Sequence, residues 1–375
     1  MNILFLTSGH LPLDDRIFYH MAATLARNGR VVQITSSKAD LVCEKEGISL
    51  NCFHGDDMSK RAKIREFTDR TLIFRPDVVI CSEPLTLLAA KRYRKAYNND
   101  LKIIYDITEW YPSKKNLGGY AISLRWFYFF VLLFFNIRAS AYASSFIFGE
   151  WYKSRPYRIF FPKKPFTYIS YFPHPDYITP LKPYLSDYKL KLTYSGRISI
   201  EKGFGNFFQV LHDLTTMNPD LKIEARVIGW YESEKDKNEC DHILKTDNKA
   251  LTVKRYDRQE LHEFINLIKD TDIFLDLRAD DLENQHCLPI KLFYYAHLGR
   301  PVIFSDLKSV RREVEIEKFG FLVPPKDTIA VSGKILEYIN NKKLYHEHCI
   351  NARELAENKY NWTLIEQKFV DFISC

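Results

Sequence analysis

The sequence predicts an α/β protein built from two doubly wound domains with parallel sheets. The chain has 375 residues, about two and a half times the length of a typical domain of ~150 residues. Short apolar runs alternate with amphipathic helical patterns in the first half, and the same alternation starts again near residue 190. A proline-rich segment, residues 161–183, separates the halves. Strand–helix–strand order with buried strands indicates parallel sheets, because the crossover helices cover the sheet faces.

In the first half, the apolar run Ile3–Leu6 predicts a buried strand rather than a signal peptide, since no basic residues precede it. The pattern from Asp14 to Asn28 predicts an amphipathic helix that Gly29 ends. Further strands and helices are expected in alternation: strands at Val31–Thr35, Val78–Cys81 and Ile103–Tyr105, and helices around Ser59–Phe74 and Pro84–Tyr97.

In the second half, a strand at Leu190–Tyr194 is followed by a helix at Phe204–Thr216. The pattern then continues with strands at Ile223–Ile228, Leu251–Val253, Ile273–Leu277 and Val302–Phe304, and with helices at Leu261–Lys269 and Ile290–Leu298. We therefore expect a domain over residues 1–172, a hinge over 173–183 and a second domain over 184–355. Ligands of such sheets bind at the carboxyl ends of the strands, here in a cleft between the domains.

Charge is divided unevenly between the halves. Residues 1–175 carry 25 Lys and Arg against 15 Asp and Glu, whereas the remainder carries 29 against 32. A basic first half suits a polyanionic partner, such as an anionic membrane surface or a phosphorylated acceptor. Nucleic acid is disfavoured because no motif of a known nucleic-acid-binding module occurs. The seven cysteines lack C-x-x-C spacing, which argues against a zinc site or disulfide framework and favours the cytoplasm.

Residues 126–137 form an uncharged aromatic run between Arg125 and Arg138. A membrane-spanning helix needs about 20 apolar residues, so this run is predicted to be too short to span. It is either a buried core helix or an interfacial helix whose flanking arginines meet lipid phosphates. The basic run Lys91–Lys95 in the same half favours the interfacial use. Candidate acceptor or membrane contacts are Arg125, Trp126, Phe130, Leu133 and Arg138.

The sharpest local motif is Tyr194-Ser-Gly-Arg-Ile-Ser-Ile-Glu-Lys-Gly203. A strand ends, Gly196 frees the turn, and Arg197 and Lys202 stand five residues apart before a helix. Arginine offers a planar fork of donors and lysine a compact charge, a pairing suited to a diphosphate. In a loop such residues are more often simply solvated, so the motif alone is weak.

A second motif runs from Glu283 to Ile303: E-N-Q-H-C-L-P-I-K-L-F-Y-Y-A-H-L-G-R-P-V-I. It leads from a polar loop into a helix with Pro289 near its start and ends that helix at Gly299. Glu283 and Asn284 are candidates for holding sugar hydroxyls. The alternative is ordinary helix capping.

Together these residues resemble the family 4 glycosyltransferases, retaining enzymes of the GT-B fold. The S-G-R-x-x-x-x-K-G string and L-P-x-K-L-F-x-Y-x-x-x-G-x-P-V-I lie in matching order, about 90 residues apart. In the first half, His10 and the stretch Asp14–Phe18 look like the opening of members that build bacterial surface polysaccharides. The resemblance implies a terminal helix, within residues 356–375, that crosses back onto the first domain.

The resemblance also implies roles for particular residues. Arg197 and Lys202 would hold the donor diphosphate beside Gly196, and Lys291 matches the lysine of L-P-x-K. The loop Asn284–Leu288, which includes His286 and Cys287, would contact the donor sugar and phosphates. Positive groups there would stabilise charge on the leaving diphosphate without a metal.

The sequence departs from the family pattern at several positions. The second family glutamate, which binds the nucleotide ribose, is replaced by Tyr294. Glu283 and Asn284 both fit the first glutamate within one residue. The family histidine after the fourth strand is replaced by Thr108, which cannot act as a base. Candidates to replace it at the reaction centre are Glu109, Asp106 and His10. The alternative for each of them is a role in helix capping or in solvation of the cleft.

The sequence therefore predicts a metal-independent glycosyltransferase of the EC 2.4 type with no cofactor. It would move a sugar from a UDP- or GDP-type donor to a lipid-linked cell-envelope glycan, in the cytoplasm or at the inner membrane face. Two alternatives remain open: a GT-B sugar-nucleotide epimerase, and a catalytically weak glycan- or nucleotide-binding protein.

Overall fold

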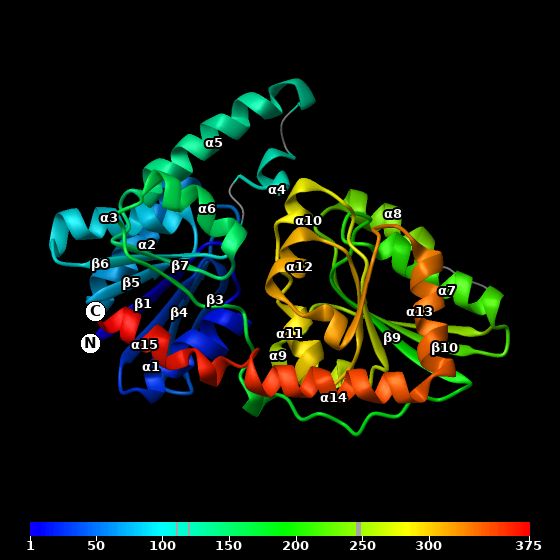
Figure 1. Cartoon of the computed structure of the whole chain (residues 1–375). Helices are drawn as coiled ribbons and strands as arrows, with labels where there is room; N and C mark the ends of the chain where they lie inside the picture. Colours follow the sequence, from blue (N-terminus) through cyan, green and yellow to red (C-terminus); the bar gives the residue numbers. More distant parts are fainter. Residues whose placement is uncertain (110–111, 119–120, 245–248) are drawn as a thin grey trace. The chain divides into compact units, whose positions relative to one another are not determined.

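The chain folds into two compact units, each with its own sheet and hydrophobic core. The first contains Met1–Tyr171 and Ile365–Cys375, and the second contains Phe172–Leu364 (Figure 1). Each unit is an α/β sandwich of the Rossmann type, which confirms the predicted fold class. The computed structural model describes residues 1–109, 112–118, 121–244 and 249–375.

The first unit has an eight-stranded sheet with the order β3-β4-β2-β1-β5-β6-β7-β8. Neighbouring strands are parallel except for the β3–β4 pair. The strands are β1 (Asn2–Thr7), β2 (Val31–Ser36), β3 (Lys38–Lys45), β4 (Ile48–His54), β5 (Val78–Cys81), β6 (Lys102–Ile107), β7 (Ser145–Phe148) and β8 (Phe166–Tyr168).

The central strands of this sheet are apolar, whereas its edge strand β3 is charged. In β1 and β5 the paired residues Leu4 and Val79 are fully buried, as expected for strands covered on both faces. The sequence analysis did not predict β3 and β4, which form a hairpin around Glu46 and Gly47, both in the left-handed region. The charged residues of β3 keep this edge strand soluble.

Helices cover both faces of the first sheet (Figure 1). The expected helix from Asp14 to Asn28 begins as a π-helix, which Asp14 caps by accepting from the backbone N–H groups of Arg16 and Ile17. The helical segments are η1 (Asp15–Ala22, π), α1 (Ala23–Arg27), α2 (Lys60–Phe74), α3 (Pro84–Tyr97), α4 (Lys114–Leu117), η2 (Ile122–Leu124, 3-10), α5 (Arg125–Ser140), α6 (Trp151–Phe160) and α15 (Glu366–Ser374).

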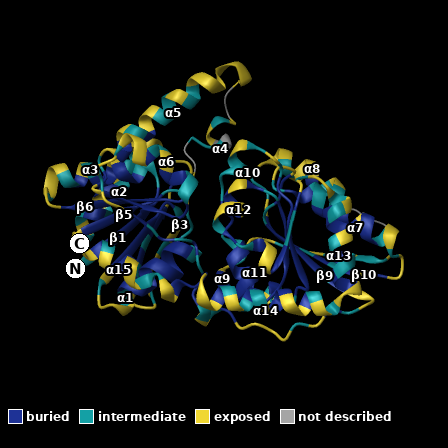
Figure 2. Cartoon of the chain, viewed as in Figure 1, coloured by how far each residue is buried: buried dark blue, intermediate teal, exposed yellow. Residues whose placement is uncertain are grey.

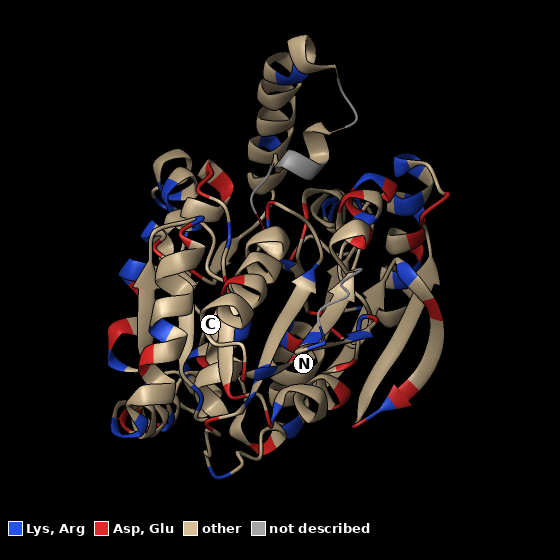
Figure 3. Cartoon of the chain, turned by 90° about the vertical axis from the view of Figure 1, so that its right-hand side faces the viewer, with Lys and Arg blue, Asp and Glu red and all other residues tan. Residues whose placement is uncertain are grey.

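The helix that contains the aromatic run is longer than the sequence predicted. Residues Ile122–Ser140 form one continuous helical stretch of 19 residues, long and apolar enough to cross a membrane by length and composition. The uncharged run, residues 126–137, is shorter than this stretch because the helix continues through Arg125 and Arg138 at its two ends. Only 11% of its most apolar window is buried, so α5 is not a core helix (Figure 2). Its ribbon carries blue but no red in Figure 3, since it contains Arg125 and Arg138 and no acidic residue.

The second unit has a six-stranded parallel sheet with the order β11-β10-β9-β12-β13-β14. Its strands are β9 (Lys189–Arg197), β10 (Lys222–Trp230), β11 (Leu251–Tyr256), β12 (Ile273–Asp276), β13 (Val302–Ser305) and β14 (Gly320–Val323). Its helices are α7 (Phe204–Met217), α8 (Glu234–Leu244), α9 (Leu261–Ile268), α10 (Leu282–Gln285), α11 (Lys291–His297), α12 (Lys308–Glu313), α13 (Thr328–Asn340) and α14 (Lys342–Asn358), with 3-10 turns η3 (Pro175–Tyr177), η4 (Ile316–Lys318) and η5 (Trp362–Leu364).

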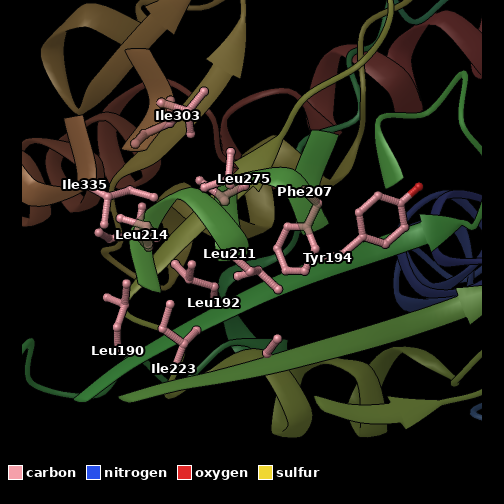
Figure 4. Close-up of a cluster of buried hydrophobic side chains, with 14 of the residues drawn as sticks. Leu190, Leu192, Tyr194, Phe207, Leu211, Leu214, Ile223, Leu275, Ile303 and Ile335 are labelled. Carbon is pink, nitrogen blue, oxygen red and sulfur yellow. The ribbon is translucent and has the colours of Figure 1, made fainter. Parts of the chain in front are cut away.

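The core of the second unit holds β9 and α7 together. Figure 4 shows its side chains, which include Leu190, Leu192, Tyr194, Phe207, Leu211, Leu214 and Ile335. All of these are at most 4% exposed. The core therefore fixes the end of β9, where the first predicted motif begins.

The division between the units differs from the expected one in two places. Residues 173–183, expected as a hinge, lie in the second unit. Residues 356–364, expected to return to the first domain, also belong to the second unit. The reason is that Tyr360 is buried against Phe293 of α11, with ring centroids 5.3 Å apart. Of the expected terminal segment, Ile365–Cys375 belong to the first unit.

Candidate active site

Four basic side chains gather at the carboxyl ends of β9 and β12 in the second unit. Arg197 ends β9, Lys202 lies in the turn before α7, Arg278 follows β12 and Lys291 begins α11. Their charges act on one another: those of Arg278 and Lys202 help to lower the pKa of Lys291. Such a concentration of positive charge at a strand edge is suited to an anion.

Two glycines shape the turn that carries the first motif. Gly196 has φ +107°, and a Cβ added to it would lie 2.8 Å from the Nζ of Lys291. Gly203 has φ +85°, and its added Cβ would lie 2.1 Å from the carbonyl oxygen of Leu277. Both residues therefore need glycine's left-handed backbone and its lack of a side chain. The turn is held close to β12 and to Lys291.

Asn284 positions Lys202. Its Oδ1 accepts a hydrogen bond from the Lys202 ammonium at 2.7 Å, and its Nδ2 donates to the carbonyl oxygens of Ala279 at 3.1 Å and Glu201 at 3.3 Å. Asn284 is 1% exposed. Its amide therefore ties the loop after β12 to the turn after β9, while the neighbouring Glu283 is half-buried.

Two lysines of this cluster have neutral hydrogen-bond partners. The Lys291 ammonium donates to the carbonyl oxygen of Ser195, and Lys202 donates to the Asn284 amide oxygen. Within the described residues, neither forms an ion pair with a carboxylate. Burial lowers the pKa of Lys291 to about 8 and also lowers that of Lys202. Lost hydration thus destabilises both ammonium ions, and a bound anion would restore their stability.

Arg197 is balanced differently. Its Nη1 donates to Glu232 at 2.6 Å, and its Nη2 donates to Glu201 at 3.3 Å. Its Nε is buried and has no hydrogen-bond partner among the described residues. A ligand could reach this Nε–H only if the side chain moved, and two carboxylates already neutralise much of the charge of the guanidinium.

Arg278 was not singled out from the sequence. Its Nε and Nη2 donate to the two carboxylate oxygens of Asp276 at 2.8 and 3.2 Å, and both residues are buried. The available signal was an aspartate and an arginine two residues apart at the end of an apolar strand. This pair adds a rigid dipole beside the two lysines.

The remaining predicted donor residues lie in one loop and one helix. Leu288 is buried, whereas His286 and Cys287 are half-buried, and the imidazole of His286 contacts the carbonyl oxygen of Leu282 at 2.9 Å. Tyr294, in place of the family glutamate, is 2% exposed and lies edge-on to Phe264 of α9. Its ring is therefore part of the packing around α11.

A second polar cluster lies at the carboxyl ends of β1, β5 and β6 in the first unit. The Nδ1 of His10 lies 2.9 Å from Asp14, and its Nε2 lies 3.9 Å from Glu83 and 3.5 Å from the Thr108 hydroxyl. Burial opposes the charged form, but the carboxylates of Asp14, Glu83 and Glu109 raise the pKa of His10 to about 10. The imidazole is therefore protonated at neutral pH and is a hydrogen-bond donor rather than a base.

Glu83, which the sequence analysis missed, holds the loop that presents His10. Its Oε2 accepts from the Ser8 backbone N–H at 2.7 Å, and its Oε1 accepts from that of Gly9 at 2.9 Å. The available signal was a carboxylate directly before the helix start at Pro84. Glu109 is exposed beside this cluster.

Asp106 has a different role from the catalytic one considered for it. Both of its carboxylate oxygens accept from Arg16, at 2.8 and 2.9 Å, and the pair is buried. Arg16 Nη1 also donates to the carbonyl oxygen of Ile169 at 2.9 Å. The pair therefore joins the π-helix η1 to β6 and has a structural role.

The five candidate acceptor or membrane residues all lie on α5. Trp126 is 73% exposed and Phe130 is 61% exposed. Arg125 and Arg138 are also exposed, whereas Leu133 is half-buried. As for a metal, the described ranges contain no group of three or more His, Cys, Asp or Glu residues placed to hold an ion.

Residues 182–355 match the family described as glycosyl transferases group 1. This segment holds all four basic residues of the β9–β12 edge. No curated protein matches the chain.

Solved structures share the whole fold at low sequence identity. Sucrose-phosphate synthase from Thermosynechococcus elongatus is 12% identical with a TM-score of 0.76, covering 99% of this chain and 98% of that one. HepE from Anabaena, solved with UDP and glucose, is 13% identical with a TM-score of 0.73, covering 100% and 99%. The lipopolysaccharide outer core galactosyltransferase WaaB is 15% identical with a TM-score of 0.63, covering 100% and 99%. The two units therefore have the GT-B fold.

Proposed function

We propose that this chain is a retaining, metal-independent glycosyltransferase of the cytoplasm. It would transfer a sugar from a nucleotide donor to a hydroxyl group of a lipid-linked cell-envelope glycan. The family match over residues 182–355 supports sugar transfer. The complex of the structural neighbour HepE with UDP-glucose supports a UDP-type donor.

The observation that carries this proposal is the pair of half-buried lysines, Lys202 and Lys291. Two ammonium ions whose hydrogen-bond partners are neutral, the Asn284 amide oxygen and the Ser195 carbonyl oxygen, are costly in a protein that binds nothing. A diphosphate would supply the missing negative charge. The same charges would then stabilise the diphosphate as it leaves the sugar, when its negative charge grows.

Three further residues of the second unit, Arg197, Glu283 and Tyr294, would also line the donor site. Arg197 would turn its free Nε–H and one arm towards a phosphate oxygen. Glu283 would hold sugar hydroxyls, because Asn284 is committed to Lys202. Buried Tyr294 would form part of the wall of the site rather than hold the ribose as a carboxylate does.

The first unit would receive the acceptor. Protonated His10 would donate a hydrogen bond to a substrate oxygen, since it cannot accept a proton at neutral pH. Glu109 would be the group able to accept the proton of the acceptor hydroxyl. Asp106 would act only by positioning, through its pair with Arg16.

Calorimetry with UDP, GDP, ADP and CMP, and with their common sugar conjugates, tests the donor site. We expect one nucleotide to bind, and Lys202→Met and Lys291→Met each to weaken it about ten- to a hundredfold, because each variant removes a charge-assisted hydrogen bond. Lys235→Met is the matched control, because this lysine lies on α8 and its side chain is 81% exposed. Unchanged affinity in both site variants would contradict the assignment.

Activity assays with the same donor separate this function from its alternatives. We expect Arg197→Ala to reduce kcat/KM for transfer roughly ten- to a thousandfold. Normal turnover by that variant, once shown to be folded, would refute the role of Arg197. Interconversion of the sugar nucleotide without transfer would identify an epimerase. Donor binding without transfer or hydrolysis would identify a binding protein.

A further inference from the structure

The helix α5 presents an unusually large apolar surface. Five aromatic residues on one side of it are 59–73% exposed, and we call them the aromatic face: Trp126, Phe127, Phe130, Phe134 and Phe135. At about 200 Å² for a fully exposed aromatic side chain, they expose roughly 600 Å². This reaches the upper limit for the largest apolar patch of a typical soluble monomer. Such a patch indicates an interaction surface.

The opposite side of α5 is fixed firmly to the first unit near its carboxyl end. Asn136 is buried there and donates to the Tyr157 hydroxyl at 2.9 Å. Lys164 donates to the carbonyl oxygens of Ser140 at 3.1 Å and Ala141 at 2.7 Å, which caps the end of the helix. The aromatic face is therefore part of a defined helix rather than of a loosely attached segment.

The sheet topology argues against a membrane span, although α5 is long enough for one. The helix connects β6 to β7, which are neighbouring parallel strands of one sheet. Both ends of the connection must therefore lie on the same side of a membrane. A second crossing through residues 108–121 is disfavoured, because that segment carries Glu109, Lys114 and Lys115.

The charges carried by the helices α3 and α5 themselves have one sign. Helices α3 and α5 together contain six basic residues and no acidic one: Lys91, Arg92, Arg94, Lys95, Arg125 and Arg138. The ammonium of Lys91 lies 4.2 Å from the centre of the Tyr142 ring, just past the end of α5. The basic residues of α3 thus adjoin the carboxyl end of α5.

A hollow between α2 and α3 combines these charges with an apolar lining. Its volume is about 450 Å³, and its lining residues are Ile64, Leu88, Lys91, Arg92, Lys95 and Ala96. Aliphatic side chains with a cationic rim suit an anionic amphiphile, whose phosphate would meet the cations while its chain meets the aliphatic groups.

We propose that α3 and α5 form a docking surface for an anionic phospholipid membrane. The aromatic face enters the boundary between headgroups and acyl chains, and the hollow takes the phosphate of one headgroup. A second copy of the chain fits less well, because a symmetric contact would oppose two sets of basic residues with no carboxylate on α3 or α5 to pair them. The surface does not depend on the donor site in the second unit.

Co-sedimentation of the whole chain with lipid vesicles tests this surface. We expect binding to vesicles of equal parts phosphatidylcholine and phosphatidylglycerol, and much weaker binding to phosphatidylcholine alone. Added salt should weaken binding to the anionic vesicles. Binding should shift Trp126 fluorescence to the blue, and Trp126→Phe should remove most of that shift. Equal binding to both vesicles would contradict the role of the basic residues.

Two double variants divide the surface into its parts. Arg92→Glu with Lys95→Glu should weaken binding to anionic vesicles about thirtyfold or more, since each lost charge changes the affinity roughly fivefold and reversal adds repulsion. Phe130→Glu with Phe134→Glu should weaken binding to both kinds of vesicle, because both aromatic side chains are exposed and normally enter the membrane. Lys235→Glu on α8 and Ile350→Glu on α14 are matched controls, 81% and 58% exposed.

Three outcomes would overturn the proposal. The proposal would be refuted if both double variants bound vesicles with wild-type affinity. A dimer that Phe130→Glu with Phe134→Glu dissociates would show that a second copy covers the face. Absence of vesicle binding would also refute it. Nucleotide affinity in vesicle-free solution reports separately on the donor site, so the docking surface and the proposed transferase can fail independently.

Discussion

Buried and half-buried charged side chains in this protein fall into two groups with different consequences. Arg16 with Asp106 and Arg278 with Asp276 are paired with good geometry, so they position neighbouring elements. Lys202 and Lys291 have only neutral partners within the described structure, so their charge is available to a ligand. Removing one partner of an ion pair leaves a buried charge, whereas removing a lysine whose partners are neutral chiefly affects binding.

His10 predicts a pH dependence of stability in the first unit. Its pKa of about 10 in the folded state lies above the ordinary value of 6.5. The folded protein therefore binds the proton more tightly than the unfolded chain does. The contribution of His10 to the free energy of unfolding is fully present below about pH 6.5 and is lost as the pH rises through about 10.

We therefore expect His10→Gln to lower the free energy of unfolding by roughly 2–4 kcal/mol near pH 6 and by little near pH 10. Urea unfolding at several pH values measures this difference. The same measurement on His212→Gln is the control, since His212 is exposed on α7. A destabilisation of His10→Gln that is equal at all pH values would show that only packing was lost.

The strand–turn–helix element β9–α7 depends on Gly203. Its backbone has φ +85°, and an added Cβ would overlap the carbonyl oxygen of Leu277 at 2.1 Å. We expect Gly203→Ala to lower the free energy of unfolding of the second unit by roughly 3 kcal/mol, from backbone strain and this clash. It should also weaken nucleotide binding, because Lys202 is the preceding residue.

Gly333 provides the opposite case within the same unit. It lies in α13, and an added Cβ would meet nothing within 4 Å. Gly333→Ala should therefore raise the free energy of unfolding by about 0.5–1 kcal/mol, because alanine loses less entropy in a helix. Urea unfolding of both variants tests the pair. Equal effects in the two variants would show that the left-handed turn is not the cause.

At the level of elements, the sequence was informative where the pattern was strong. Every predicted strand overlaps an observed one, because buried parallel strands are runs of apolar residues. The β3–β4 hairpin was missed, since its edge strand alternates charged residues without a long apolar run. The length of α5 was underestimated because the count stopped at its flanking arginines.

The candidate site was predictable as a set of motifs but not as a set of partners. Arg197 and Lys202 were chosen from their spacing and Lys291 from its resemblance to the lysine of L-P-x-K. The structure places all three at the carboxyl ends of the strands of one sheet. The pairing of Arg278 with Asp276, and of Asp106 with Arg16, depends on contacts between strands and helices that spacing does not specify. Long-range pairing therefore decided which polar residues are committed to structure.

At the scale of the whole molecule, the chain leaves its first unit and returns to it. Residues Ile365–Cys375 belong to the first unit, although the preceding residues from Phe172 onward belong to the second. In α15, Phe369 is fully buried, and the ammonium of Lys102 donates to the carbonyl oxygens of Phe372 and Ile373 at 3.0 Å. The last helix is thus a structural part of a domain that begins more than 300 residues earlier.

Because each unit has a separate core, each should unfold with its own transition. Phe369→Ala should lower the free energy of unfolding of the first unit by roughly 3–5 kcal/mol, the usual cost of emptying a buried phenylalanine site. The transition of the second unit should not move, and a bound nucleotide should raise only that transition, by about 2.7 kcal/mol at a hundred times its Kd. Calorimetry of the whole chain with and without nucleotide measures both effects, with exposed Gln367→Ala as the control on the same helix. If Phe369→Ala lowers the nucleotide-sensitive transition instead, α15 contributes to the second unit, and the division of the chain at Ile365 is wrong.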